Sequence, residues 1–171
     1  SSIASKLSHL KITSWNIRGT QQWIWKESYL KSTNPDIIVL NELWNLKEIK
    51  GFKSYHIHDR DTDTGKINTS IFIRQEIPHK RVYANCQENF IPIEIGDFFI
   101  VAMYRRPVQW PAQHHRLDHV ISALKNDLSR EYNSPSIIFV GDYNSSTWKP
   151  PFQDLTHRHY TFDFPELPGT N

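Results

Sequence analysis

Short apolar runs recur along the chain and are separated by polar turns. Each run is rich in Ile, Val and Phe and is bounded by Pro, Gly, Asn or Asp, which is typical of β-strands. The pattern predicts strands at Leu10–Trp15, Asp36–Leu40, Thr69–Arg74, Phe90–Ile95, Phe98–Met103 and Ser136–Val140. Asp36–Leu40 and Ser136–Val140 are apolar almost without alternation, which indicates strands buried on both faces, as in the middle of a sheet covered by helices.

Two further segments have helical periodicity. Pro111–Glu131 carries one apolar stripe opposite a charged face. The stripe consists of Leu117, Val120, Ile121, Leu124 and Leu128. Gln21–Lys31 is predicted as a second helix, which ends before Pro35. Its stripe is less regular and consists of Trp23, Trp25, Tyr29 and Leu30.

The order of these elements predicts mixed sheets. Gly96-Asp97 joins Phe90–Ile95 to Phe98–Met103 and is a hairpin signal. A whole helix stands between Phe98–Met103 and Ser136–Val140, and such a connection lets these two strands run parallel. We therefore expect an α/β fold in which helices cover the faces of mixed sheets.

Composition narrows the class of protein. The 171 residues are enough for one well-cored domain and too few for two ordinary ones. With 38% hydrophobic and 22% charged residues, the chain is globular in composition. No apolar run approaches the roughly 20 residues of a membrane-spanning helix, and no signal peptide is visible. The single cysteine, Cys86, excludes an internal disulfide. The net charge of +2 is too small to indicate a nucleic-acid binder, although a local basic patch could contact phosphates.

Polar residues follow three of the predicted strands. Asn16 comes after the first, Asn41-Glu42 after the second, and Gly141-Asp142-Tyr143-Asn144 after the last. Alternate residues of a strand point to the same side, so Asp142 and Asn144 are expected to converge. Ligands of such sheets bind beyond the carboxyl ends of the strands, and Mg²⁺ prefers oxygen ligands. For each residue alone a turn former is the favoured interpretation, but the set together indicates a hard-cation site.

Four segments in order resemble the motifs of one superfamily. Ile12–Gly19 is similar to its strand running into Trp-Asn. Pro35–Glu42 is similar to its PDIIxLQE motif, with Asn41 in place of the usual Gln. Met103–Pro107 resembles its VYxPP segment, and Phe139–Asn144 resembles its GDFN motif, with Tyr for Phe. The chain thus resembles the metal-dependent endonuclease/exonuclease/phosphatase superfamily. Within it, the chain is most similar to the apurinic-endonuclease-like domains of non-LTR retrotransposons, which carry a strand similar to residues 69–74.

The resemblance implies a four-layer α/β sandwich with mixed sheets, and it implies roles for individual residues. Glu42 would ligate Mg²⁺, for which Mn²⁺ could substitute, and Asn16 would help to position the metal or the phosphate. Asp142 would orient or deprotonate the attacking water, while Asn144 and Tyr104 would hydrogen-bond the scissile phosphate. We interpret the cations beside these motifs as a phosphate-contacting rim. They are Arg18, Arg105, Arg106 and Lys149.

The last two motifs of the family, a Ser-x-Ile-Asp strand and Ser-Asp-His, are not found in the sequence. We therefore expect residues 1–171 to form a single domain that is C-terminally incomplete and belongs to a longer polypeptide. The leading hypothesis is a Mg²⁺-dependent endonuclease that nicks duplex DNA. Its expected location is intracellular and nuclear, and it is expected to be linked to a reverse transcriptase.

Two alternatives remain open. The first is a phosphoesterase of the same fold that acts on RNA or small phosphoesters, because the core motifs are shared and substrate choice resides in surface loops. The second is a catalytically inactive, domesticated relative that serves as a binding or assembly module, and the missing Asp-His end motivates it.

Overall fold

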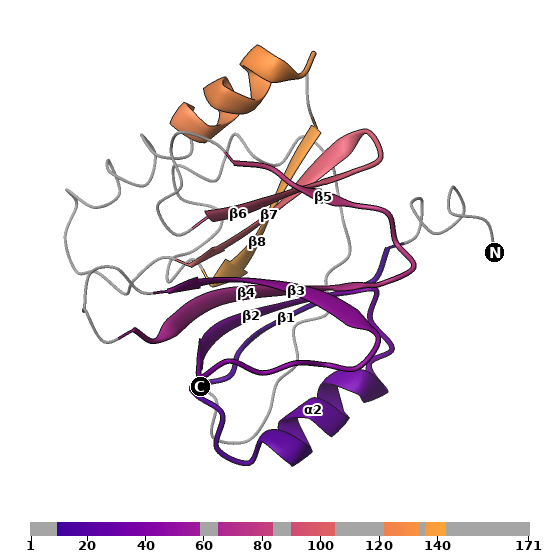
Figure 1. The fold of residues 1–171 in the computed structure, drawn as a ribbon, viewed down its shortest axis with the longest axis vertical. Coiled ribbons are helices and arrows are strands. Elements are labelled where there is room, and N and C mark those ends of the chain that lie inside the picture. Colours follow the sequence, from indigo (N-terminus) through magenta and orange to yellow (C-terminus); the bar gives the residue numbers. More distant parts are fainter. Residues whose placement is uncertain (1–9, 59–64, 84–89, 105–121, 134–135, 143–171) are drawn as a thin grey trace.

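The computed structural model describes residues 10–58, 65–83, 90–104, 122–133 and 136–142. These residues form two four-stranded sheets that pack face to face (Figure 1). The first sheet, in spatial order, comprises β1 (Ile12–Asn16), β2 (Ile37–Trp44), β4 (Ile67–Arg74) and β3 (Phe52–His58). The second comprises β5 (Lys80–Arg81), β6 (Phe90–Ile95), β7 (Phe98–Tyr104) and β8 (Ser136–Asp142).

Both sheets are mixed, as the order of the elements predicts. In the first sheet β1 and β2 run parallel, and β4 is antiparallel to both β2 and β3. In the second, β5, β6 and β7 are antiparallel neighbours, whereas β7 and β8 run parallel. The predicted hairpin at Gly96-Asp97 is confirmed, and Gly96 has a φ of +58° there. The predicted parallel pairing of the strands on either side of the long helical segment is also confirmed.

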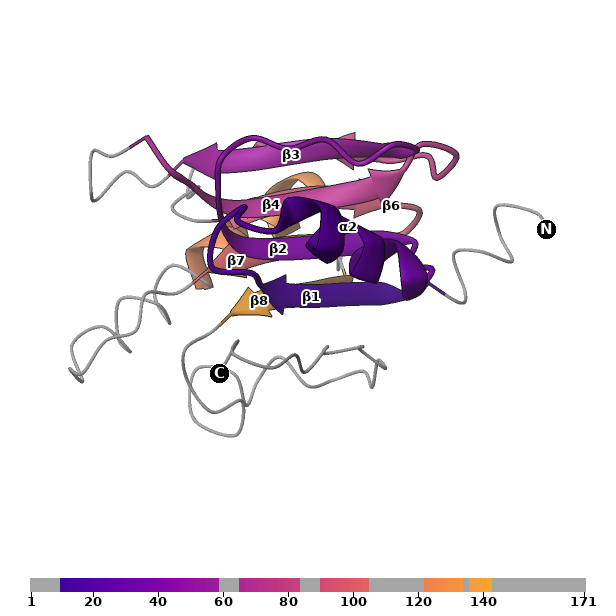
Figure 2. The same cartoon turned by 90° about the horizontal axis from the view of Figure 1, so that it is seen from below.

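Helices form the two outer layers. α2 (Trp23–Ser32) covers the outer face of the first sheet, where its Leu30 packs with Leu40 and Phe72. Residues 122–131 are helical and cover the outer face of the second sheet through Leu124 and Leu128. Figures 1 and 2 show the resulting order of helix, sheet, sheet and helix. The fold is therefore the expected four-layer α/β sandwich.

Two strands contribute to the core on both faces, as their apolar sequences predict. In β2, Val39 packs between the sheets, while Leu40 packs under α2. In β8, Val140 packs between the sheets, and Phe139 packs under the helical residues 122–131. β2 lies between two neighbouring strands. β8 stands last in the order of the described strands of its sheet.

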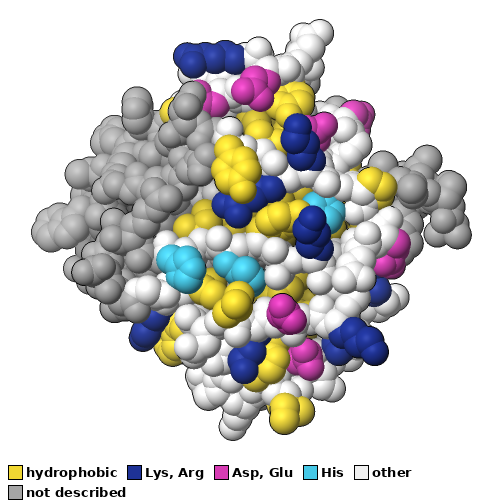
Figure 3. Space-filling view, in the orientation of Figure 1, with side chains coloured by type: hydrophobic (Ala, Val, Ile, Leu, Met, Phe, Trp, Pro, Cys, Tyr) yellow, Lys and Arg dark blue, Asp and Glu magenta, His cyan; other side chains and the backbone are white. Residues whose placement is uncertain are grey.

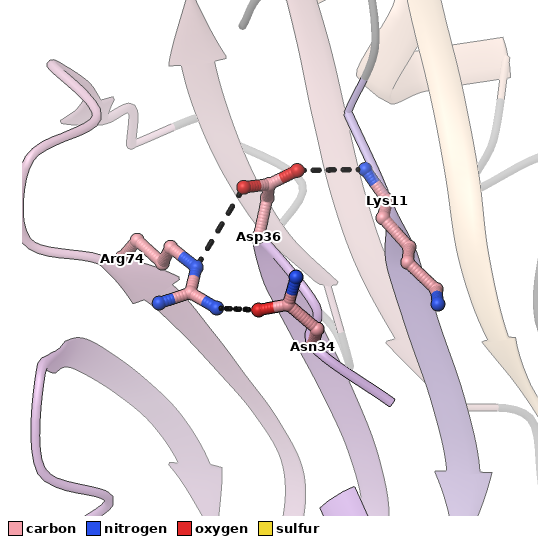
Figure 4. Close-up of polar contacts among 4 residues, drawn as sticks. All are labelled: Lys11, Asn34, Asp36 and Arg74. Atoms are coloured by element: carbon pink, nitrogen blue, oxygen red, sulfur yellow. Dashed lines mark hydrogen bonds and ion pairs between the residues drawn. The ribbon is translucent and has the colours of Figure 1, made fainter. Parts of the chain in front are cut away.

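A polar clasp fastens the first sheet at the end where β2 begins (Figure 4). One carboxylate oxygen of Asp36 accepts a hydrogen bond of 3.0 Å from the Lys11 main-chain N–H, and the other lies 3.6 Å from Nε of Arg74. The Arg74 guanidinium also donates to the side chain of Asn34 at 2.8 Å. The clasp joins the segments before β1 and β2 to the end of β4, and thus helps to set the register of three strands.

The structure corrects several sequence-based expectations. Two strands were not predicted: β3, whose residues are mostly half-buried, and the two-residue β5. In α2 the expected apolar stripe is wrong at Trp25, which is 51% exposed, because Lys26 occupies the buried face instead. Three residues of the apolar stripe predicted for the longer helix lie outside the described residues, namely Leu117, Val120 and Ile121. Within the described part of the chain, neither helical segment has the length and apolar character needed to cross a membrane.

Candidate active site

Polar residues from both sheets meet where parallel strands end. Asn16 closes β1 opposite Asn41 of β2, and Tyr104 closes β7 opposite Asp142 of β8. β8 is in contact with both β1 and β2, so the strand ends of the two sheets form one edge of the sandwich. Figure 2 shows the arrowheads of β1 and β8 side by side at this edge. The tertiary structure thus brings together segments separated by more than a hundred residues of sequence.

Glu42 stands at the centre of this edge. Its carboxylate oxygen Oε2 accepts a hydrogen bond from the side-chain amide of Asn16 and one of 3.5 Å from the hydroxyl of Tyr104. Asn16 and Glu42 are half-buried, and Tyr104 is 9% exposed. Among the described residues both donors reach Oε2, which leaves Oε1 available to a ligand. Three residues far apart in the sequence therefore form one amide–carboxylate–phenol cluster.

A β-bulge aims Glu42 at this edge. Asn41 pairs with Thr69 and Trp44 pairs with Ile67, so three steps along β2 match two along β4 and one residue is extra. Glu42 itself has a φ of +56°, in the left-handed region that non-glycine residues rarely adopt. Bulges of this kind turn a side chain out of the regular alternation. The predicted end of this strand at Leu40 is therefore wrong, because the strand continues through the bulge to Trp44.

Asn41, next to Glu42 in β2, supports the site through hydrogen bonds to neighbouring segments. It is completely buried, and its side-chain amide donates to the main-chain oxygen of Met103 in the other sheet at 3.1 Å. Its own main-chain oxygen accepts from the N–H of Ile17 at 3.1 Å. The sequence showed Asn41 only as a substitute for the family's usual Gln, and its role as a link between the sheets was not predicted.

The loop after β1 is held against Glu42 from two sides. The Gly19 N–H donates to the Glu42 main-chain oxygen at 2.7 Å. From the other side, the ammonium of buried Lys26 donates to the main-chain oxygens of Ile17 at 2.7 Å and Gly19 at 2.9 Å. Burial lowers the pKa of Lys26 below its usual 10.5. Sequence reasoning missed Lys26, and its only signal was a lysine on the apolar face of a predicted helix.

Arg18 occupies the middle of this loop. It is exposed, has a φ of +52°, and its N–H donates to the side-chain oxygen of Asn16 at 3.2 Å. Its carbonyl accepts a hydrogen bond of 2.7 Å from the side chain of Gln21. The structure thus brings Arg18, one of the four predicted rim cations, next to the Asn16–Glu42 pair.

Of the remaining predicted site residues, the structure describes only Asp142, and only its main chain. Asp142 is placed through its main chain, as the partner of Tyr104 at the end of β8. The others lie outside the described residues, namely Asn144, Arg105, Arg106 and Lys149. The expected convergence of Asp142 and Asn144 therefore stays a prediction.

The oxygen donors at this edge suit Mg²⁺. That ion is commonly held by one or two carboxylates, with water and substrate phosphate completing its octahedral shell. Glu42 supplies one carboxylate, and the main chain of Asp142 brings a second carboxyl residue to the same edge. In the described segments no three His, Cys, Asp or Glu side chains gather into a common cluster, as a closed all-protein metal cage would require. The donor set therefore fits an open site that keeps positions for water and phosphate.

Fold and site together define a class of four-layer α/β sandwich proteins whose polar residues lie where the strands of both sheets end. Residues 13–169 match the endonuclease/exonuclease/phosphatase family, and the chain belongs to this family. Its members are phosphodiesterase and phosphatase hydrolases. No curated protein matches the chain in sequence.

Solved structures from several organisms share the fold. An AP endonuclease from Archaeoglobus fulgidus has a TM-score of 0.58 at 15% identity, over 82% of this chain and 59% of that one. The 3′ phosphatase NExo from Neisseria, bound to a product DNA hairpin, has a TM-score of 0.54 at 18% identity, over 79% of this chain and 58% of that one. A humanized D. rerio TDP2 has a TM-score of 0.52 at 16% identity, over 80% of this chain and 63% of that one. The matched region thus spans about three-fifths of each of these proteins, and the likeness supports the fold.

Proposed function

We propose that the chain is a Mg²⁺-dependent endonuclease domain that nicks duplex DNA, as the endonuclease domains of non-LTR retrotransposons do. The cluster of Asn16, Glu42 and Tyr104 carries this proposal, because it is formed by residues from both sheets at the edge where ligands of such sheets bind. The nick leaves a 3′ hydroxyl that primes reverse transcription. The domain then belongs to a polypeptide that also contains a reverse transcriptase, and it acts in the nucleus.

The proposed chemistry divides the work among a few side chains. Glu42 would hold the metal, and Asn16 keeps its carboxylate in place through Oε2. Mg²⁺, or Mn²⁺ in its place, would neutralise charge on the phosphate oxygens when bound. Asp142 takes a proton from the attacking water. The Tyr104 hydroxyl and the Asn144 amide hydrogen-bond the scissile phosphate and stabilise its developing charge.

Arginine and lysine side chains around this edge bind the DNA backbone in the proposal. Arg18 is exposed beside Asn16, as a phosphate contact requires. Arg105 and Arg106 follow Tyr104 in sequence, and Lys149 comes soon after Asn144. Two of the similar structures support DNA as the substrate through their own descriptions, one an AP endonuclease and the other bound to a DNA hairpin.

A plasmid-nicking assay tests the proposal. With Mg²⁺ the full-length domain is expected to convert supercoiled plasmid to the open circle, and excess EDTA is expected to abolish the reaction. Glu42→Gln keeps the shape of the side chain but loses the charge that binds the metal, so the nicking rate should fall at least about 100-fold. Glu48→Gln, at an exposed position of the same chain, is the matched control and should retain activity.

The same assay separates the competing functions. Equal nicking by wild type and Glu42→Gln would exclude the proposed site. RNA or a small phosphodiester hydrolysed faster than plasmid would instead indicate a phosphoesterase of another specificity. Absence of any Mg²⁺-dependent hydrolysis would support an inactive relative that only binds.

A further inference from the structure

A basic and aromatic surface lies on the side of the sandwich opposite β1 and β8. Here β3 and β5 are the last described strands of their sheets, and Arg81 of β5 lies 5.9 Å from the ring centre of Tyr55 in β3. We call this surface the β3–β5 patch and define it by Lys53, Tyr55, His79, Arg81 and Tyr83. Figure 3 shows this face, with Lys and Arg side chains beside hydrophobic and His side chains near its centre.

Tyr55 contacts three other residues of the patch. The Lys53 ammonium lies 5.7 Å and the Arg81 guanidinium 5.9 Å from the centre of this ring. The Tyr55 hydroxyl shares a hydrogen bond of 3.0 Å with Nε2 of His79. Arg81 also lies 5.0 Å from the centre of the Tyr83 ring. Residues from β3, β5 and the segments flanking β5 thus form one surface of alternating cations and rings.

Within the described part of the chain, no ion pair with a carboxylate involves Lys53 or Arg81 of the patch. The ion pairs formed there involve Lys31, Arg74 and Arg130. Nε of Arg81 is buried and has no hydrogen-bond partner in that part of the chain.

The exposed ring of Tyr83 narrows the choice of ligand. It is 68% exposed, although a large aromatic side chain is usually mostly buried. Bases of a single strand stack on such rings while its phosphates meet nearby cations, whereas bases of a duplex already stack on one another. We propose that the β3–β5 patch binds single-stranded nucleic acid. Tyr83 stacks on one base, and Lys53 and Arg81 contact the adjacent phosphates.

The patch is separate from the candidate active site. β2 and β3 are both antiparallel to β4, so His58 at the end of β3 lies toward the same edge as Glu42. Lys53 lies five residues back along β3, about 17 Å from His58. Binding at the patch therefore does not depend on cleavage at Glu42, and the two proposals can fail independently.

Fluorescence anisotropy of the purified chain in EDTA tests the patch without cleavage. The probes are a labelled oligothymidylate of about 15 nucleotides, within the range of known single-strand sites, and a duplex of equal length. The single strand should bind more tightly than the duplex, and its affinity should fall as salt rises. Tyr83→Ala should weaken single-strand binding at least about fivefold, because stacking on one ring contributes about 1 kcal/mol or more. Lys53→Ser should also weaken it and should reduce its dependence on salt, because one phosphate contact is lost.

Matched variants on α2 supply the controls. Lys31→Ser removes a half-exposed cation and Trp25→Ala removes a half-exposed ring, both remote from the patch. Both should keep wild-type affinity. Equal losses in the patch and control variants, or tighter binding of the duplex, would overturn the proposal. Thermal unfolding of each variant shows whether a loss of binding is a loss of folding instead.

Discussion

At the scale of the residue, the candidate site contains conformations and charges that cost free energy. Glu42 and Trp44 have φ values of +56° and +69°, and left-handed backbone costs a non-glycine residue about 1–2 kcal/mol. Lys26 carries a buried cation. Such costs concentrate where function requires a particular geometry. Here the hydrogen bonds of Asn16, Tyr104 and Lys26 hold that geometry in place.

His56 gives stability a dependence on pH. Its pKa in the folded chain is about 4, below its usual 6.5, because burial and then the charges of His58 and Arg81 oppose protonation. Between these two values the unfolded chain binds the proton more readily. The free energy of unfolding should therefore fall as pH drops through this window, by at most about 1.4 kcal/mol per pH unit, and the decline due to His56 should end near pH 4.

The variant His56→Gln tests this contribution. Glutamine can still bond to Ser54 and Ser70, the two hydroxyl partners of His56, but it does not titrate. Urea unfolding at about pH 7 and at about pH 5 should show a smaller loss of stability in the variant than in the wild type. The same loss in both proteins would contradict the assignment.

At the scale of the element, a close approach of two strands sets the position of Asp142. Gly141 has a φ of +144°, and a Cβ built there would lie 1.8 Å from the main-chain oxygen of Met103 in β7. No side chain fits at that distance. The glycine of the Gly-Asp motif is therefore required by the packing of β8 against β7, and this packing brings Asp142 opposite Tyr104.

Gly141→Ala should accordingly lower the free energy of unfolding by more than a glycine-to-alanine change at another position of positive φ. We expect a loss of about 2–4 kcal/mol in the free energy of unfolding, from backbone strain and from displacement of β8. The control is Gly51→Ala, because Gly51 has a φ of +89° but no atom within 4 Å of the built Cβ. Gly51→Ala should lose only the free energy of unfolding that backbone strain costs, about 1–2 kcal/mol. Chemical denaturation of both variants measures the difference, and equal losses would show that the contact with Met103 is unimportant.

Prediction from sequence succeeded best for elements whose signal is local. Phe90–Ile95 was predicted with its observed ends, because its apolar run ends at the turn of Gly96-Asp97. β3 was missed since its half-buried residues carry weak periodicity, and it is a strand only through pairing with β4. The left-handed turn at Glu42 was also invisible, because glutamate is not a residue that favours positive φ.

At the scale of the whole molecule, the two sheets share one core and one site. Isoleucines of both sheets fill the space between them, among them Ile71 of β4 and Ile100 of β7. Polar contacts cross the same interface, among them those from Asn41 to Met103 and from Tyr104 to Glu42. The geometry around Glu42 therefore depends on how the sheets pack as well as on strand register within each sheet.

Asn41 and its strand partner Thr69 offer a paired test of this dependence. Asn41→Ala leaves the buried oxygen of Met103 without its donor and opens a cavity, so the free energy of unfolding should fall by about 2–3 kcal/mol. Nicking should fall as well, since Tyr104 follows Met103 in β7.

The hydroxyl of Thr69 is equally buried but has no hydrogen-bond partner among the described residues. Thr69→Val should therefore be neutral or stabilising by up to about 1 kcal/mol. A loss in Thr69→Val as large as that in Asn41→Ala would contradict the special role of the cross-sheet bond.

Local patterns in the chain were sufficient to predict the strand-rich α/β class and the two helical segments, because periodicity and turn chemistry act over a few neighbouring residues. The motifs that contain Asn16, Glu42 and Asp142 were recognised by their resemblance to those of a superfamily. Tertiary packing was needed to reveal the bulge that turns Glu42, the bond from Asn41 across the sheets, the burial of Lys26 and the meeting of β3 with β5. Each of these features depends on strand register, or on contacts between segments remote in sequence, and such contacts leave no periodic trace in the residues that make them.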